Sequence, residues 1–218
     1  ISYRLVGSEM CIRDSHNKDQ IDKLNLHEND FVYVEKGGEI IPKIVGVSKE
    51  KRALNAKPIL FKEKCPCSFQ SNLIKIDGEA QHYCINHKNC PPQILGRFKH
   101  FISRKAMNID GFGIETIERL IKINELKTFS DIYTLNEQKL VSIDRMAEKS
   151  AENLLTAIKN SISQPFHKVL FSLGIRHVGE TVALNLVNHF ETIENLMNAD
   201  FEEIISVNEI CLLYTSDA

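Results

Sequence analysis

The hydrophobic positions in the second half of the chain repeat at intervals of a little over thirty residues. An apolar residue, two variable residues, an apolar residue and then a small residue occur in this order from Ile109, Ile143 and Ile175, and the first four positions recur from Val207. The starts are 34, 32 and 32 residues apart. This period predicts four pairs of short helices, each joined by a hairpin turn, in a helical array over residues 93–210.

Further apolar residues flank each turn at helical spacing, two positions before the start and eleven and twelve positions after it. They predict the core faces of the paired helices, which we expect to pack pairwise. These residues are Met107, Val141, Leu173 and Ile205 before the turns, and Leu120, Ile121, Leu154, Leu155, Leu186 and Val187 after them.

The small residue of each turn, which is Gly113, Ala147 or Gly179, predicts a positive φ or a crowded backbone conformation. The helix that follows begins with unpaired amide N–H groups and the positive end of its dipole, which can bind phosphate. A helical array that binds only proteins has a similar period. Four copies of the turn with basic residues favour recognition of a nucleic-acid backbone instead. The candidate contacts on the turns are Gly111, Gly113, Arg145, Arg176, His177 and Gly179.

A local basic cluster precedes the first turn. The helical run LGRFKHFISRKAMN contains Arg97, Lys99, Arg104 and Lys105. A solvated helix face is the ordinary explanation for such charges, but their position next to the first turn favours contact with phosphates. In the later repeats, Thr134 with Glu137 predicts a capping box, and Pro165 predicts a helix start.

The first part of the chain has a β pattern. Two β-rich runs, residues 31–34 and 39–47, flank Gly37-Gly38 and predict a β-hairpin with Pro42 at an edge or bulge. Two strands cannot bury a core by themselves, so we expect them to be part of a small barrel.

Four cysteines follow this hairpin. Cys65, Cys67, Cys84 and Cys90 have a spacing that predicts a closed thiolate site, for which zinc is the expected metal. The first pair encloses a single residue, so it stays open whether both of its cysteines bind or whether His82 or His87 replaces one. Between the pairs, Lys75-Ile76-Asp77-Gly78 matches the signature of a nucleotidyl-accepting lysine, but no walled pocket is expected there and a β-turn is the better interpretation.

The composition of the chain says more about its cellular compartment than about its function. The 218 residues hold 27 basic and 29 acidic side chains, so no overall positive charge indicates nucleic acid. No stretch predicts a membrane span or signal peptide, and the clustered cysteines favour a reducing interior with metal ligation over disulfides.

Three unlike stretches together resemble bacterial NAD-dependent DNA ligase. They are HNKDQIDKLNLHENDFVYVEKGGEIIPKIVGV, the four cysteines with GEAQHYCINHKNCPPQ, and the hairpin runs HFISRKAMNIDGFG and LGIRHVGET. In that family they occur in the same order, as the end of an oligonucleotide-binding (OB) barrel, a zinc module and four helix-hairpin-helix units. The family often has glycine where Arg145 and Ala147 stand here, so the second turn would hold phosphate less closely or through the Arg145 side chain.

The resemblance implies a mainly α fold with a small β part. Residues 16–62 would be the C-terminal part of an OB-fold, residues 63–92 a four-cysteine zinc finger, and residues 93–210 a helix-hairpin-helix domain. Residues 1–15 and 211–218 resemble translated adapter sequence, so we expect them to be non-native ends of an internal piece of a longer protein.

The implied function is the DNA-binding portion of a ligase that seals nicks in duplex DNA during replication and repair. NAD and magnesium would be bound by missing domains, so no catalytic residue is expected here and the chain alone should be inactive. The implied partner is nicked double-stranded DNA, bound by a monomer in the bacterial cytoplasm in association with the nucleoid. Two alternatives stay open: a free-standing zinc-stapled helix-hairpin-helix protein of repair or recombination, and an interaction array without nucleic acid.

Overall fold

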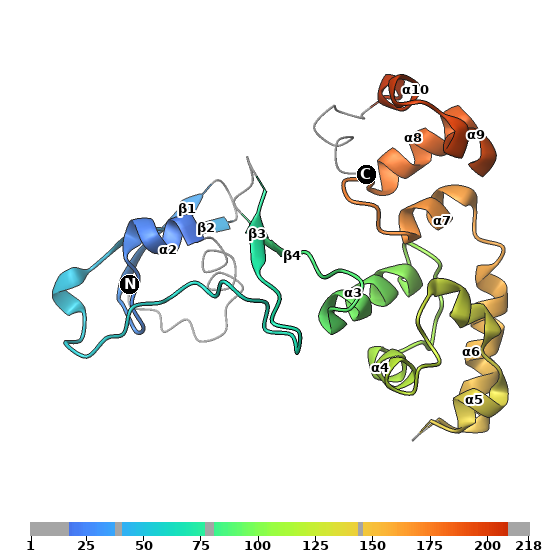
Figure 1. Ribbon diagram of the computed structural model, residues 1–218, viewed down its shortest axis with the longest axis horizontal. Helices are drawn as coiled ribbons and strands as arrows, with labels where there is room; N and C mark the ends of the chain where they lie inside the picture. The colour runs from blue at the N-terminus through green and yellow to red at the C-terminus, as the bar shows by residue number, and fades with distance from the viewer. Residues whose placement is uncertain (1–17, 38–40, 77–80, 144–145, 209–218) are drawn as a thin grey trace. The chain divides into compact units, whose positions relative to one another are not determined.

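The computed structural model describes residues 18–37, 41–76, 81–143 and 146–208 (Figure 1). Contacts within the chain divide it into two compact units, residues 1–90 and 91–218. Arg145, Gly38 and the two ends predicted to be non-native lie outside the described residues. Within the described ranges, no helix has both the length and the apolar character needed to cross a membrane.

The first unit contains a short helix and two β-hairpins. Strands β1 and β2 pair in antiparallel orientation. Their pairing shifts by one residue between Tyr33 and Val34, and this shift is a β-bulge. The predicted hairpin is therefore present, with Pro42 in an edge strand opposite Lys36. The elements are α2 (Lys18–Leu24), β1 (Val32–Gly37), β2 (Ile41–Val47), η1 (Lys49–Lys51), β3 (Leu73–Lys75) and β4 (His82–Cys84).

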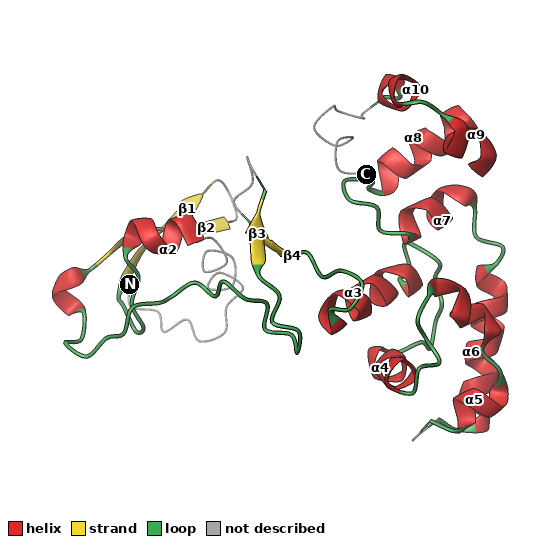
Figure 2. Cartoon of the chain, viewed as in Figure 1, coloured by secondary structure: helices red, strands yellow, loops and turns green. Residues whose placement is uncertain are grey.

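The second unit is an array of helices (Figure 2). The first hairpin is α3 and α4, the second α5 and α6, the third α7 and α8, and α10 leads into the fourth turn. Short helices that the periodicity did not predict, η2 and α9, precede the second and fourth hairpins. The elements are α3 (Pro91–Ile102), α4 (Ile114–Lys122), η2 (Phe129–Thr134), α5 (Glu137–Val141), α6 (Glu148–Ser161), α7 (Phe166–Ser172), α8 (Glu180–Phe190), α9 (Ile193–Asn198) and α10 (Phe201–Ser206).

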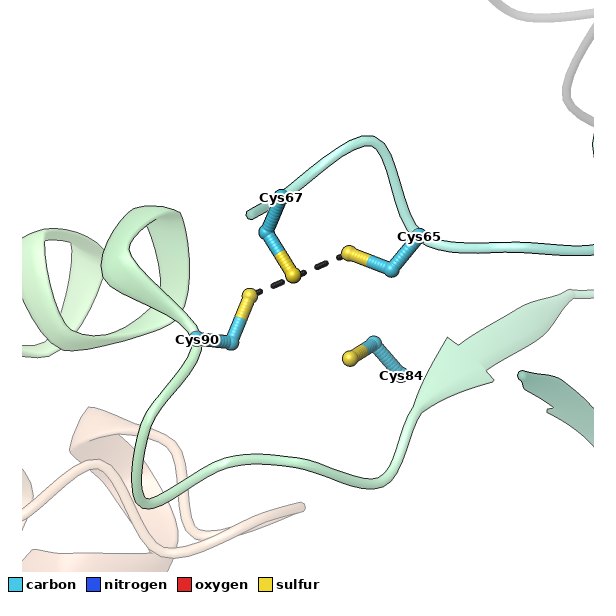
Figure 3. A group of neighbouring side chains, drawn as sticks. All are labelled: Cys65, Cys67, Cys84 and Cys90. Carbon is cyan, nitrogen blue, oxygen red and sulfur yellow. Dashed lines mark hydrogen bonds between the residues drawn. The ribbon is translucent and has the colours of Figure 1, made fainter. Parts of the chain in front are cut away.

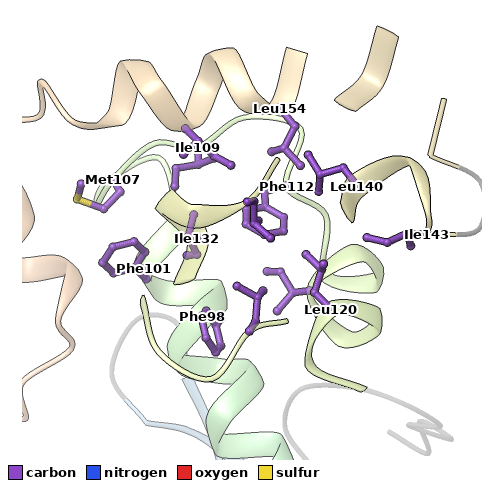
Figure 4. Close-up of a cluster of buried hydrophobic side chains, with 14 of the residues drawn as sticks. Phe98, Phe101, Met107, Ile109, Phe112, Leu120, Ile132, Leu140, Ile143 and Leu154 are labelled. Carbon is purple, nitrogen blue, oxygen red and sulfur yellow. The ribbon is translucent and has the colours of Figure 1, made fainter. Parts of the chain in front are cut away.

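Two hydrophobic clusters hold this array together. The larger cluster joins Ile109 and Leu120 of the first hairpin to Leu140 and Leu154 of the second (Figure 4). The smaller one joins the third hairpin to Val207, which directly follows α10; its buried residues are Leu170, Ala183, Leu186, Phe190 and Val207. The predicted pairwise packing is therefore confirmed, and its cause is that one short helix pair cannot bury its own apolar face.

Several predicted core positions are exposed instead. Val141 and Leu173, each two positions before a turn, have 40% and 43% of their surface exposed, and Ile175 has 37%. In these repeats Leu140 and Leu170 occupy the buried face of the leading helix. Val141 directly follows the buried Leu140 and so lies about 100° around α5 from it. Leu173 lies directly after the last residue of α7, outside the helix.

The predicted capping box at the second repeat is wrong. Asn136 caps α5 by accepting the N–H of Lys139, whereas Thr134 donates its hydroxyl to the Asp131 carbonyl. The capping box forms earlier, between Thr128 and Asp131 at the start of η2. The predicted helix start at Pro165 is correct, since α7 begins at the next residue.

Candidate metal centre and nucleic-acid interface

The four cysteines of the first unit lie together (Figure 3). The Sγ atoms of Cys65, Cys67, Cys84 and Cys90 are all within 4.8 Å of one another, and those of Cys65 and Cys90 are 3.9 Å apart. Tetrahedral zinc with Zn–S bonds of about 2.3 Å has sulfur–sulfur distances of roughly 3.8 Å. The cluster therefore has the donors and spacing to hold a tetrahedral metal ion.

Backbone hydrogen bonds bring both members of the short first pair to the cluster. The N–H of Cys65 donates to the Ser71 carbonyl at 2.9 Å, and the N–H of Gln70 donates to the Cys67 carbonyl at 3.0 Å. Gln70 has a positive φ of 45°, which closes the turn tightly. A single intervening proline thus does not keep either sulfur out of the cluster.

The thiols of this pair have opposite pKa shifts. Burial opposes ionisation of Cys67, but hydrogen bonds from the Cys65 thiol and the N–H of Phe69 hold the pKa of Cys67 below its ordinary value. For Cys65, a hydrogen bond from the Cys67 backbone lowers the pKa, but burial and the neighbouring thiols raise it to about 12. Thiolates this close repel one another, and a bound cation would remove that penalty.

The two histidines considered as substitute ligands have other contacts. His87 Nδ1 lies 3.0 Å from the Ile85 carbonyl oxygen, and the His82 ring packs on Phe61 with centroids 4.6 Å apart. Neither joins the metal-ligand group found among the described residues.

Lys75 lies on β3 as part of a hairpin, with its Nζ 2.7 Å from Asp19 Oδ2. Its side chain is 40% exposed and engaged in this ion pair. These surroundings differ from the enclosed nucleotide pocket that a nucleotidyl-accepting lysine needs.

The helix after each of the first three turns begins at the small residue. Gly113, Ala147 and Gly179 are the exposed N-cap residues of α4, α6 and α8, and none supplies a capping side chain. In contrast, α5, α9 and α10 are capped by the side chains of Asn136, Thr192 and Asp200. No capping side chain therefore competes with an external acceptor for the first amides of these helices, although the Ser150 N–H of α6 already donates to the Ala147 carbonyl.

Both predicted reasons for the small residue, a positive φ and a crowded conformation, are wrong at Gly113 and Gly179. The φ angles of Gly113 and Gly179 are −70° and −79°. Positive values occur two positions earlier, at Gly111 (79°) and His177 (65°). A Cβ added at Gly113 or Gly179 would meet nothing within 4 Å, so the space beside both residues is open to an approaching molecule.

The predicted basic contacts of the first hairpin are exposed. Arg97 and Lys99 lie on α3, and Arg104 and Lys105 lie in the turn after it. Lys105 Nζ is 3.2 Å from Oε2 of Glu180, the first residue of α8. This ion pair places the segment directly after α3 beside the start of α8, next to Gly179.

A second link between these hairpins was not predicted. His100 Nε2 on α3 donates to the Phe171 carbonyl oxygen at 2.8 Å, and the two rings pack edge to face. That carbonyl belongs to the last turn of α7, where helical carbonyls lack partners within the helix. Periodicity could not reveal a contact between residues 71 positions apart.

A charge asymmetry in the sequence was also missed. No lysine or arginine follows Arg176, so the rest of the chain carries only acidic charges and histidines. The acidic residues of the described part after Arg176 are Glu180, Glu191, Glu194, Asp200, Glu202 and Glu203. The basic candidates therefore all lie in the first three hairpins.

Two family models match the chain. Residues 5–56 match the NAD-dependent DNA ligase OB-fold domain, and residues 168–213 match the helix-hairpin-helix motif. The first match starts within the segment 1–15 for which we predict a non-native origin.

Curated relatives match almost the whole chain. The chain is 51% identical to a DNA ligase of Christiangramia forsetii, 47% to one of Flavobacterium psychrophilum and 50% to one of Bacteroides fragilis. Each match covers 95% of this chain and 31% of the relative, so the chain spans less than a third of their length. The resemblance seen in the sequence is confirmed: over almost its whole length the chain is similar to part of these DNA ligases, and its first part matches the OB-fold domain of the NAD-dependent ones.

Proposed function

We propose that this chain is the DNA-binding portion of an NAD-dependent DNA ligase and that it grips the backbone of nicked duplex DNA as a monomer. The observation that carries this proposal is the set of three exposed helix starts without side-chain caps at Gly113, Ala147 and Gly179. Backbone amides at such starts recognise phosphates without reading bases. Binding would therefore be independent of the DNA sequence.

Side chains around these starts would supply the charge. Arg97, Lys99 and Arg104 are exposed near the first hairpin, and Arg176 and His177 lie on the third turn. Acidic residues at the helix starts oppose phosphate binding, but Glu180 is paired with Lys105 across the two hairpins. Arg145 on the second turn completes the proposed set.

The four cysteines would bind zinc as a structural ion. Thiolate donors and tetrahedral spacing fit zinc, and a segment with three-residue strands has too little core to hold its shape without such a staple. NAD and magnesium would act in the adenylation part of the ligase, so we expect this chain alone to accept no adenylate, including at Lys75.

Fluorescence anisotropy with a labelled nicked duplex tests the grip. We expect affinity to fall with salt, with a slope of about 0.9 for each phosphate neutralised, and to be similar for unrelated sequences. Gly113→Val and Gly179→Val should each weaken binding about tenfold, because the added side chain occupies the space where a phosphate would approach.

These substitutions are suited to the test because both glycines have extended φ and ψ that valine adopts readily. Circular dichroism should show unchanged helicity. Asn160→Val, at an exposed position near the end of α6, is the control and should bind like the wild-type chain. Binding that ignores salt, or equal affinity for all variants, would refute the proposal.

A further inference from the structure

A cavity of about 430 Å³ lies between α3 and the third turn. Gly96, Arg97 and His100 line it from α3, and Leu173, Gly174 and Ile175 line it from the turn. Its volume is in the range of ligand-binding clefts, which combine apolar walls with a few polar groups. All of its lining residues belong to the second unit.

Gly96 is not explained by packing within the protein. It lies in the interior of the twelve-residue helix α3, where glycine costs about 1 kcal/mol relative to alanine. A Cβ added there would meet nothing within 4 Å, and its φ is not in the left-handed region. The missing side chain therefore leaves space in the cavity and answers no steric need of the fold.

The opposite wall of the cavity is apolar and exposed. Leu173 and Ile175 occupy positions that are apolar in every repeat, but here 43% and 37% of their surfaces face solvent. Val178, which also lines the cavity, is partly buried in the smaller cluster. An apolar wall facing water beside Arg97 suits a ligand that is both apolar and anionic.

The cavity is held in shape by a contact between its two sides. His100 donates to the Phe171 carbonyl, and Gly174 adopts a φ of 66° directly against the His100 ring. A Cβ at Gly174 would come within 3.3 Å of His100 Cδ2. Glycine at this position therefore lets the third turn approach α3 closely, so the site is largely preformed.

We infer that this cavity is a binding site for one sugar–phosphate unit of DNA, separate from the amide groups at the helix starts. The deoxyribose would pack on Leu173 and Ile175, and the phosphate would face Arg97. The inference rests on the proposed function and adds to it a binding site between two hairpins. A DNA strand would pass through this site from the first hairpin to the third.

Charge around the cavity supports an anionic polymer as its ligand. Arg97 is the one cation among the lining residues, and Arg176 and His177 follow Ile175 directly on the turn. Phosphates continuing along a DNA strand would meet these groups in succession. Recognition would not depend on base identity, because only sugar and phosphate enter the site.

Gly96→Leu tests the inference, because the new side chain enters the cavity and leucine favours the helix. We expect affinity for the nicked duplex to fall about tenfold, the loss of one charge-assisted hydrogen bond. The salt slope should fall by about 0.9. Asn160→Leu is the matched control and should change neither value. A Gly96→Leu chain that is folded and binds with wild-type affinity and slope would overturn the inference.

NMR of the wild-type chain gives a second readout that needs no variant. The amide signals of Gly96 and Gly174 should shift when the nicked duplex is added, and the signal of Asn160 should not. If the amide signal of Gly113 shifts while those of Gly96 and Gly174 do not, the cavity does not bind the DNA, but the proposed function still holds. If the wild-type chain fails to bind DNA at low salt, both fail.

Discussion

Asp30 and Arg52 hold together the connections around the first β-hairpin. Arg52 Nε and Nη2 donate to the two carboxylate oxygens of Asp30, each at 2.8 Å, and Nη2 also donates to the Asn25 carbonyl. The His27 N–H donates to the same carboxylate. The side chain of Asp30 is only 2% exposed, so its charge is separated from water and depends on these donors.

Arg52→Met should lower the free energy of unfolding of the first unit by about 2 kcal/mol, because it leaves the buried Asp30 charge without its main partner. Denaturant unfolding followed by the NMR signals of β1 and β2 measures this change. Lys49→Met, three residues earlier and exposed, is the control and should change stability by about 0.5 kcal/mol or less. Equal effects of the two substitutions would contradict the assigned role of Arg52.

The contribution of Asp30 and Arg52 to stability depends on pH. Burial alone would raise the pKa of Asp30, but the hydrogen bonds from Arg52 and the His27 N–H outweigh it and the pKa lies below the ordinary 3.8. The stability from Asp30 is therefore fully present above pH 3.8 and is lost as the pH falls through the lower folded value. Arg52→Met should reduce this acid sensitivity, since it removes most of the shift.

At the scale of the element, the cysteine segment has little core besides the cysteines themselves. Strands β3 and β4 have three residues each. Among the described residues of this segment, the buried cluster consists of Cys65, Cys67 and Cys90, with Leu73 and Cys84 packed against it. Without a bound cation, few other contacts would keep the thiols together. Folding of this segment and metal binding should therefore be coupled.

A strong chelator should unfold residues 65–90 and leave the helices of the second unit in place. The expected result is loss of the NMR signals of β3 and β4 with little change in the far-ultraviolet helical signal, restored by added zinc. Cys84→Ser should behave like the chelated chain. Metal analysis that finds no zinc in natively purified protein would contradict the assignment.

Local patterns in the sequence predicted much of this architecture. The repeat from Ile109 located three hairpins, and the spacing of the cysteines located the cluster, because both signals lie within short stretches. The periodicity did not predict η2 and α9, since these short helices lie between the repeats. It also placed Leu173 in the core, although this residue lies directly after the last residue of α7 and is exposed.

The missed features of the candidate site are tertiary ones. The His100 to Phe171 hydrogen bond and the open space beside Gly96 depend on how hairpins pack, and no spacing rule records that. The Lys105 to Glu180 ion pair likewise joins charges that the sequence presents as unrelated. The acidic character of the chain after Arg176 is different, because it was readable from the sequence alone.

At the scale of the second unit, packing and charge divide the four repeats differently. The hydrophobic clusters pair the first hairpin with the second and the third with the fourth. Basic residues, in contrast, occur in the first three hairpins, and the helices α9 and α10 carry acidic ones. The fourth repeat therefore completes a core for the third hairpin, but its charge would repel a phosphate backbone.

We therefore predict that the fourth repeat lies away from bound DNA. Arg104→Gln should weaken binding of a nicked duplex and lower the salt slope by about 0.9, the loss of one phosphate contact. Glu202→Gln, a one-charge change at a position on α10 that is also exposed, should leave the slope unchanged and alter affinity by less than about twofold, because charges farther than about 8 Å are screened at physiological salt. Anisotropy titrations over a range of salt concentrations measure both. If Glu202→Gln strengthens binding as much as Arg104→Gln weakens it, α10 faces the DNA and the strand must cross all four hairpins.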